Sequence, residues 1–235
     1  MSGASTQNRD GGFHLAGEEL ESLYERFPWL YAVCRDHLFR DDTEKIADAL
    51  WPTGTPPEGS SLLELGCGPG FYARRLAACF GHLRVTGIDR SSEQLRRARE
   101  AASQLGNCTF EEGDVLSLDR PASSVNVVVV SRLFIVLSER KQVIEEMHRV
   151  LRPGGRCFVA EPRSAIRANV PLYALRLRAR LSHLYGTPGS YREPGKISVM
   201  TPGEFGALIG TQPWASTRLW QDTWYQYAVC EKRRQ

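Results

Sequence analysis

The stretch Leu62-Leu63-Glu64-Leu65-Gly66-Cys67-Gly68-Pro69-Gly70 decides the fold of this 235-residue chain. An apolar run ends in three glycines at alternate positions, and a segment compatible with a helix, Phe71 to Phe80, follows directly. This order predicts a strand, a tight turn and a helix, because glycine adopts the backbone conformations of such a turn and lets a ligand approach the main chain. Since open α/β sheets bind ligands beyond the carboxyl ends of their strands, the turn predicts a nucleotide-like ligand.

The glycine spacing and the acid inside the strand distinguish between such ligands. A dinucleotide fingerprint reads G-x-G-x-x-G, whereas Gly66, Gly68 and Gly70 alternate. Glu64 would repel a pyrophosphate, but it suits a ligand that carries an ammonium group and a sulfonium charge. A nicotinamide oxidoreductase is therefore disfavoured.

Later segments follow in the order of repeated strand–helix units. The apolar run Leu83–Ile88 ends in Asp89, about 20 residues after the glycines, where a carboxylate can accept hydrogen bonds from both ribose hydroxyls. Val125–Ser131 predicts a strand buried on both faces. Ile135–Leu151 predicts a helix, and the Pro-Gly-Gly that follows it predicts a stop and a reversal of the chain.

Together these segments resemble the class I S-adenosylmethionine-dependent methyltransferases of small-molecule type, similar to the ubiquinone/menaquinone C-methyltransferases and natural-product methyltransferases. The glycine turn resembles their motif I, Gly113-Asp114 their G-D-x segment, and R-V-L-R-P-G-G at residues 149–155 the signature before their fifth strand. The likeness covers about residues 61–163. It implies a Rossmann-like α/β fold: a seven-stranded, mostly parallel sheet with helices on both faces and a closing antiparallel hairpin. It also implies S-adenosyl-L-methionine as the cofactor.

The resemblance also assigns the cofactor site. The three glycines would carry the methionine portion, Glu64 would organise its amino group, Asp89 would hold the ribose, and Asp114 would receive the adenine. Each feature also has a plain structural explanation, since a glycine turn often only joins a strand to a helix and Asp89 could cap the next helix. The residues expected to bind the cofactor are Glu64, Gly66, Cys67, Gly68, Gly70, Asp89, Arg90, Asp114, Val115, Ser131 and Arg132.

The chain divides into three parts. Residues 1–12 are polar and predict a disordered tail, residues 13–58 predict a helical lid rich in aromatic side chains, and residues 59–235 predict the methyltransferase domain. Residues 163–200 predict a helical insertion after the fifth strand, because they far exceed an ordinary connection. We expect the lid and the insertion to enclose an acceptor.

Composition excludes several classes of partner. The net charge of +3 is too small to indicate nucleic acid. Six cysteines without a C-x-x-C pair predict a reduced, cytoplasmic protein with no metal site. Arsenite methyltransferases bind arsenic through cysteines, so this role stays open for Cys34 and Cys67, although packing is the simpler explanation. No apolar run is long enough to insert stably in a membrane, but peripheral contact through the arginines of the insertion stays open.

The acceptor side of the site is less defined. The segment Ser131-Arg132-Leu133-Phe134 lacks the N-P-P-Y or D-P-P-Y of base N-methylating enzymes, and no carboxylate set for magnesium lies near it. We therefore expect in-line methyl transfer to a small, aromatic or lipid-like acceptor. The alternative is a non-catalytic module that binds S-adenosylmethionine, or a partner subunit. The acceptor atom and the oligomeric state stay open.

Four residues are candidates for proton transfer. Glu161 is placed best, because it ends the predicted fifth strand and would face the crevice, and the alternative is that it only anchors the lid. Histidine titrates near neutrality and so suits a base, yet His37 and His183 are more simply surface side chains. Tyr24 is more simply a packing residue of the lid. The candidate catalytic residues are Glu161, His37, His183 and Tyr24.

Overall fold

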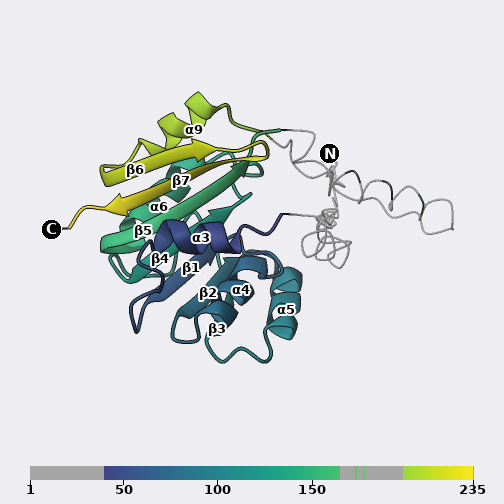
Figure 1. The fold of residues 1–235 in the computed structure, drawn as a ribbon. Helices are drawn as coiled ribbons and strands as arrows, with labels where there is room; N and C mark the ends of the chain where they lie inside the picture. Colours follow the sequence, from purple (N-terminus) through teal and green to yellow (C-terminus); the bar gives the residue numbers. More distant parts are fainter. Residues whose placement is uncertain (1–39, 165–172, 174–176, 178–180, 182–197, 235) are drawn as a thin grey trace, which may run out of the picture.

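The computed structural model describes residues 40–164 and 198–234, together with Tyr173, Leu177 and Leu181 (Figure 1). The predicted tail, most of the predicted lid and most of the predicted insertion lie outside the described residues. Among the described residues, no helix combines the length and the apolar character that a membrane span requires.

One seven-stranded sheet organises the described residues. In chain order its strands are β1 (Ser61–Leu65), β2 (Arg84–Asp89), β3 (Cys108–Glu112), β4 (Val125–Ser131), β5 (Leu151–Pro162), β6 (Trp214–Gln221) and β7 (Tyr225–Lys232). Their order across the sheet is β3-β2-β1-β4-β5-β7-β6 (Figure 1). Strands β1 to β5 pair in parallel, whereas β7 is antiparallel to both β5 and β6. The predicted mostly parallel sheet with an antiparallel closing hairpin is confirmed, and its order reverses between β1 and β4, where such sheets bind ligands.

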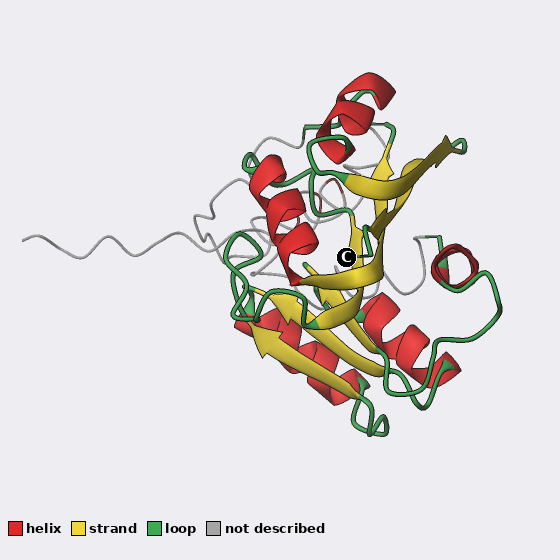
Figure 2. Ribbon diagram, turned by 90° about the vertical axis from the view of Figure 1, so that its left-hand side faces the viewer, coloured by secondary structure: helices red, strands yellow, loops and turns green. Residues whose placement is uncertain are grey.

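Helices cover both faces of the sheet (Figure 2). The described helices are α3 (Thr43–Leu50), α4 (Phe71–Cys79), α5 (Ser92–Ala101), α6 (Arg140–Val150) and α9 (Pro202–Ile209). Apolar side chains of α3, α4 and α5 share one core with the sheet, and those of α6 and α9 share the other. The central strands serve both cores, since Val127 and Val129 of β4 face one and Val128 and Val130 face the other. This explains why β4 is continuously apolar.

The turn after β1 has the backbone that its glycines predict. Gly66, Gly68 and Gly70 have φ angles of +65°, +53° and +73°. These lie in the left-handed region, which residues with a Cβ rarely adopt. Gly70 is also the N-cap residue of α4. A Cβ on Gly70 would lie 2.5 Å from the ring of Phe110 on β3, so this glycine lets the helix pack closely on the sheet.

The helix after β4 begins later than the sequence predicts. It was expected from Ile135, but α6 starts at Arg140, with Glu139 as its N-cap residue. The preceding residues 133–137 are all apolar, and tertiary contacts hold them: the Phe134 N–H donates to Glu161 Oε1 at 2.9 Å. An uninterrupted apolar run lacks helical spacing. Here it forms a loop at the carboxyl end of the central strand β4.

Replacing Gly70 by alanine should lower the free energy of unfolding by about 2–4 kcal/mol, because the left-handed backbone and the overlap with Phe110 both carry a cost. The matched control is Gly203→Ala in α9, where a Cβ meets nothing within 4 Å. That change should leave stability the same or raise it by up to about 1 kcal/mol. Urea denaturation of both variants measures the difference, and equal effects would contradict this account of the turn.

Candidate functional site

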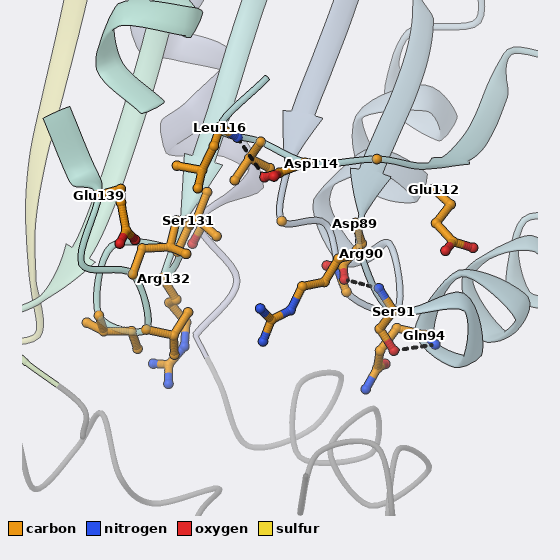
Figure 3. Close-up of a pocket in the computed structure, with 18 residues that line it drawn as sticks. Asp89, Arg90, Ser91, Gln94, Glu112, Asp114, Leu116, Ser131, Arg132 and Glu139 are labelled. Carbon is orange, nitrogen blue, oxygen red and sulfur yellow. Dashed lines mark hydrogen bonds between the residues drawn. The ribbon is translucent and has the colours of Figure 1, made fainter. Parts of the chain in front are cut away.

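A cavity of about 720 Å³ opens at the carboxyl ends of the parallel strands (Figure 3). Its walls come from the turn after β1, the ends of β2 and β3, and the segment after β4. Eight of the eleven residues expected to bind the cofactor line it. They are Gly66, Gly68, Asp89, Arg90, Asp114, Val115, Ser131 and Arg132. The structure therefore brings together residues that lie far apart in the sequence.

Asp89 at the tip of β2 joins two turns through its carboxylate. Its Oδ2 accepts a hydrogen bond from the Gly68 N–H at 2.8 Å, and its Oδ1 accepts one from the Ser91 N–H at 2.9 Å. Each carboxylate oxygen can accept more than one hydrogen bond. Asp89 is thus oriented by the protein and keeps acceptor capacity toward the cavity, where Figure 3 places it beside Arg90 and Ser91.

Asp114 follows β3 and is oriented in a similar way. Its Oδ1 accepts a hydrogen bond from the Leu116 N–H at 2.9 Å, which is the local turn that aspartate commonly makes. Val115 beside it is buried, and both residues line the cavity. A flat apolar group could lie on Val115 while the second Asp114 oxygen accepts a hydrogen bond from it.

Three expected cofactor residues, in or next to the turn, do not line the cavity. Glu64 is 4% exposed, and its Oε2 accepts a hydrogen bond from the Ala73 N–H in the first turn of α4 at 2.7 Å. Gly70 packs against Phe110, as described above. Cys67 is buried, and this burial, together with the nearby charges of Glu64 and Asp89, raises the pKa of its thiol well above the ordinary value. Their direct contact with a ligand stays a prediction.

The raised thiol pKa bears on the arsenic interpretation, because a thiolate is the form that binds metal and metalloid ions. At Cys67 that form is disfavoured, and Cys34 lies outside the described residues. No group of three or more histidine, cysteine, aspartate or glutamate side chains suited to a metal ion occurs within the described ranges.

Of the four candidate catalytic residues, the structure describes Glu161. It does not line the cavity: its side chain is 1% exposed, behind the segment that follows β4. Burial raises the pKa of its carboxyl to about 7, while the Phe134 N–H and the charges of Arg132 and Arg140 act in the opposite direction. His37, His183 and Tyr24 lie outside the described residues, so their roles stay predictions.

Sequence reasoning missed the apolar wall opposite Asp89. Leu133, Ile135, Val136 and Leu137 line the cavity, and Val136 is 50% exposed. The sequence analysis assigned residues 135–137 to a helix and therefore did not place them at the cavity. Five consecutive apolar residues before Ser138 are the pattern that could have indicated this wall. The other lining residues outside the expected set are Ser91, Gln94, Glu112, Gly113, Leu116 and Glu139.

Arg132 follows β4 and lines the cavity next to Leu133, the first residue of the apolar wall. Its φ of +60° is left-handed, which is uncommon for a residue with a side chain and is typical of functional sites. Its N–H donates to the Ala160 oxygen at 2.9 Å, and its Nη1 donates to the Tyr225 hydroxyl at 3.1 Å. The main chain of Arg132 is therefore bound to β5 and its guanidinium to the first residue of β7.

Comparison with known proteins gives a consistent result. Residues 62–155 match the family model described as a methyltransferase domain. The chain is 38% identical over 122 residues to the 27-O-demethylrifamycin SV methyltransferase of Amycolatopsis mediterranei, covering 51% of this chain and 44% of that protein. It is 26% identical over 197 residues to the demethylmenaquinone methyltransferase of Clavibacter sepedonicus, covering 82% and 77%. The chain spans half or less of the length of the first curated relatives that it matches.

Solved structures agree on the fold. The [4+2]-cyclase SpnF superposes with a TM-score of 0.63 at 18% identity, covering 91% of this chain and 95% of that chain. A SAM-dependent methyltransferase from Methanosarcina mazei superposes with a TM-score of 0.56 at 23% identity, covering 78% and 97%. At these identities the likeness concerns the fold, and SpnF is named for a different reaction.

Replacing Asp89 by alanine should weaken the binding of S-adenosylhomocysteine by about 100-fold or more, because it would remove the charged acceptor predicted for two ribose hydroxyls and release the Gly68 N–H. Isothermal titration calorimetry measures the affinity. The control is Glu145→Ala, an exposed carboxylate of α6 paired with Lys141. An affinity of Asp89→Ala within threefold of the unchanged protein would remove Asp89 from the site.

Proposed function

Because this chain contains a class I S-adenosylmethionine-dependent methyltransferase domain, we propose that it transfers a methyl group to a small acceptor of aromatic or lipid-like character. One observation carries the proposal: a single cavity joins the polar cofactor side at Asp89 and Asp114 to the apolar wall at residues 133–137. Methyl transfer by in-line displacement needs donor and acceptor in contact within one site. A cavity of about 720 Å³ is in the range that small-molecule sites occupy.

The lining residues suit S-adenosylmethionine. The left-handed backbone at Gly66 and Gly68 opens the turn toward the cavity, so the main chain can approach the methionine portion. Asp89 would accept hydrogen bonds from the ribose, and Asp114 and Val115 would hold the adenine. When bound, this cofactor supplies a methyl group already activated by the sulfonium charge.

The protein's own contribution is then mainly orientation. Glu139 lies on the acceptor side and is exposed, but the Ser138 hydroxyl donates to it and holds its pKa below the usual value, which makes it a weak base. Glu161 is enclosed behind the wall. Among the described residues this favours an acceptor that ionises readily or needs no strong base. Proton transfer by His37, His183 or Tyr24 stays a prediction.

The apolar wall supports the proposed class of acceptor. Leu133, Ile135 and Leu137 surround the half-exposed Val136 with side chains that offer no hydrogen bond, so a ring or an alkyl chain would gain most there. A relative from Synechocystis, 33% identical over 118 residues, is named for 2-methyl-6-phytyl-1,4-hydroquinone, a ring with an apolar chain. Other relatives are named for trans-aconitate and arsenite. The proposed class of acceptor therefore rests mainly on the apolar wall and less on the names of the relatives.

The test is turnover of a panel of acceptors with radiolabelled S-adenosylmethionine. Alkylated hydroquinones and phenols should be methylated, whereas trans-aconitate and arsenite should not. Micromolar binding of S-adenosylmethionine without turnover of any acceptor would favour the alternative, a binding module or a partner subunit. Failure to bind the cofactor at all would contradict both.

Replacing Val136 by serine should raise KM for an alkylated hydroquinone by up to about 10-fold. This factor corresponds to the free energy gained when one such apolar side chain is buried against the acceptor. The affinity for S-adenosylhomocysteine should stay unchanged. Leu219→Ser is the matched control, because Leu219 is also about half exposed, at 46%, but lies on the edge strand β6. Equal KM values for both variants would place the acceptor elsewhere.

A further inference from the structure

The main chain of Phe134 is held on both sides of its Cα by charged side chains. Its N–H donates to Glu161 Oε1 at 2.9 Å, and its carbonyl oxygen accepts a hydrogen bond from Arg140 Nε at 2.7 Å. Arg140 also donates to the Leu137 oxygen at 3.0 Å and to the Ser198 oxygen at 2.7 Å. Two charged groups thus fix the two consecutive peptide groups that meet at Phe134, in a loop that has no regular structure of its own. The first of them, which carries the Phe134 N–H bound by Glu161, is called the Phe134 peptide below.

That peptide lies in the middle of the apolar wall. Leu133 and Ile135 on either side of Phe134 line the cavity, while the Phe134 ring is fully buried. Leu133 also meets the cofactor side, because a Cβ on Gly66 would lie 2.7 Å from its Cδ1. A change in the orientation of the Phe134 peptide would therefore move the acceptor wall relative to the glycine turn.

Glu161 is built into this position. It lies opposite Gln226 of β7 in the strand register, and its Oε2 is fully enclosed and makes no hydrogen bond to the described residues. The groups that lower its pKa against this burial are the Phe134 and Leu133 N–H groups and the charges of Arg132, from the segment after β4, and Arg140, from α6. From β7 the polar neighbours are Gln226 and Tyr225, whose hydroxyl accepts from Arg132. A carboxylate that accepts a hydrogen bond from a main-chain N–H and feels the charges of two arginines is favoured in its ionised form, although burial opposes ionisation.

We propose that Glu161 is a positioning residue, which sets the acceptor wall through the Phe134 peptide and does not itself exchange a proton with the acceptor. The proposal rests on the function proposed above, since it assigns residues 133–137 to acceptor binding. It differs from the sequence-based expectation, in which Glu161 faced the crevice as a base.

A pH dependence follows from the burial. Because the pKa of Glu161 is raised to about 7, the carboxyl gains a proton as the pH falls through neutrality. A neutral carboxyl accepts a hydrogen bond less strongly than a carboxylate, so the Phe134 peptide is held less firmly at lower pH. For the acceptor, kcat/KM should fall by about tenfold between pH 8 and pH 6 through a rise in KM, while the affinity for S-adenosylhomocysteine stays constant.

The test compares the unchanged protein with Glu161→Gln, which keeps the shape and one acceptor oxygen but does not ionise in this range. The first readout is the amide resonance of Phe134 as a function of pH, which requires no turnover. In the unchanged protein it should titrate with a midpoint near 7, and in Glu161→Gln it should not titrate. The second readout is kcat/KM for the acceptor, which in Glu161→Gln should be flat with pH and about tenfold below that of the unchanged protein at pH 8.

The matched variant is Glu64→Gln, another buried carboxylate that accepts one backbone N–H, from Ala73 on the cofactor side. It should weaken cofactor binding and leave the Phe134 titration intact. A Phe134 amide that does not titrate near neutrality, or that titrates equally in Glu161→Gln, overturns the proposal. If the amide titrates as expected but no acceptor is turned over, the function proposed above fails while the contact between Glu161 and Phe134 stands.

Discussion

The backbone of the turn after β1 is the constraint on which the rest of the site depends. Three alternate residues adopt left-handed conformations, at Gly66, Gly68 and Gly70, and only glycine does so at little cost. This turn brings α4 against β3 and directs the Gly68 N–H to Asp89 on the neighbouring strand. The cavity that this turn lines also contains the acids at the ends of β2 and β3 and the segment after β4. The site therefore lies where the strand order reverses, between β1 and β4.

Acids at the ends of the parallel strands have a second role in this molecule, because they hold main-chain groups in place. Glu64 accepts from the first turn of α4, Asp89 accepts from the turns after β1 and β2, and Glu161 accepts from the loop after β4. Each lies at or near the carboxyl end of a parallel strand, where loops lack the hydrogen bonds of the sheet. A carboxylate suits this task, since it accepts several hydrogen bonds and makes stronger ones than a neutral oxygen.

The sequence predicts the sheet, its closing hairpin and most of the cofactor side, because these depend on local signals: glycine spacing, an acid after an apolar run, and a Pro-Gly-Gly stop. It does not predict the apolar wall of the cavity. Residues 133–137 are apolar and could continue a helix, and what keeps them in a loop is a contact with Glu161, 27 residues later in the chain. The same long-range contact turns Glu161 away from the crevice. The sequence also does not show that the Glu64 carboxylate accepts a hydrogen bond from the first turn of α4, and its contact with a ligand stays a prediction.

The most direct measurement is the change in backbone amide resonances when the protein is titrated with S-adenosylhomocysteine. The account predicts that the largest shifts occur at Gly66–Gly70, Asp89–Ser91 and Gly113–Leu116, the three turns around the cofactor side of the cavity. Resonances of the edge strand β6 should not change. Shifts concentrated on β6 or α9, or none at saturating ligand, would contradict the assignment of this cavity as the cofactor site.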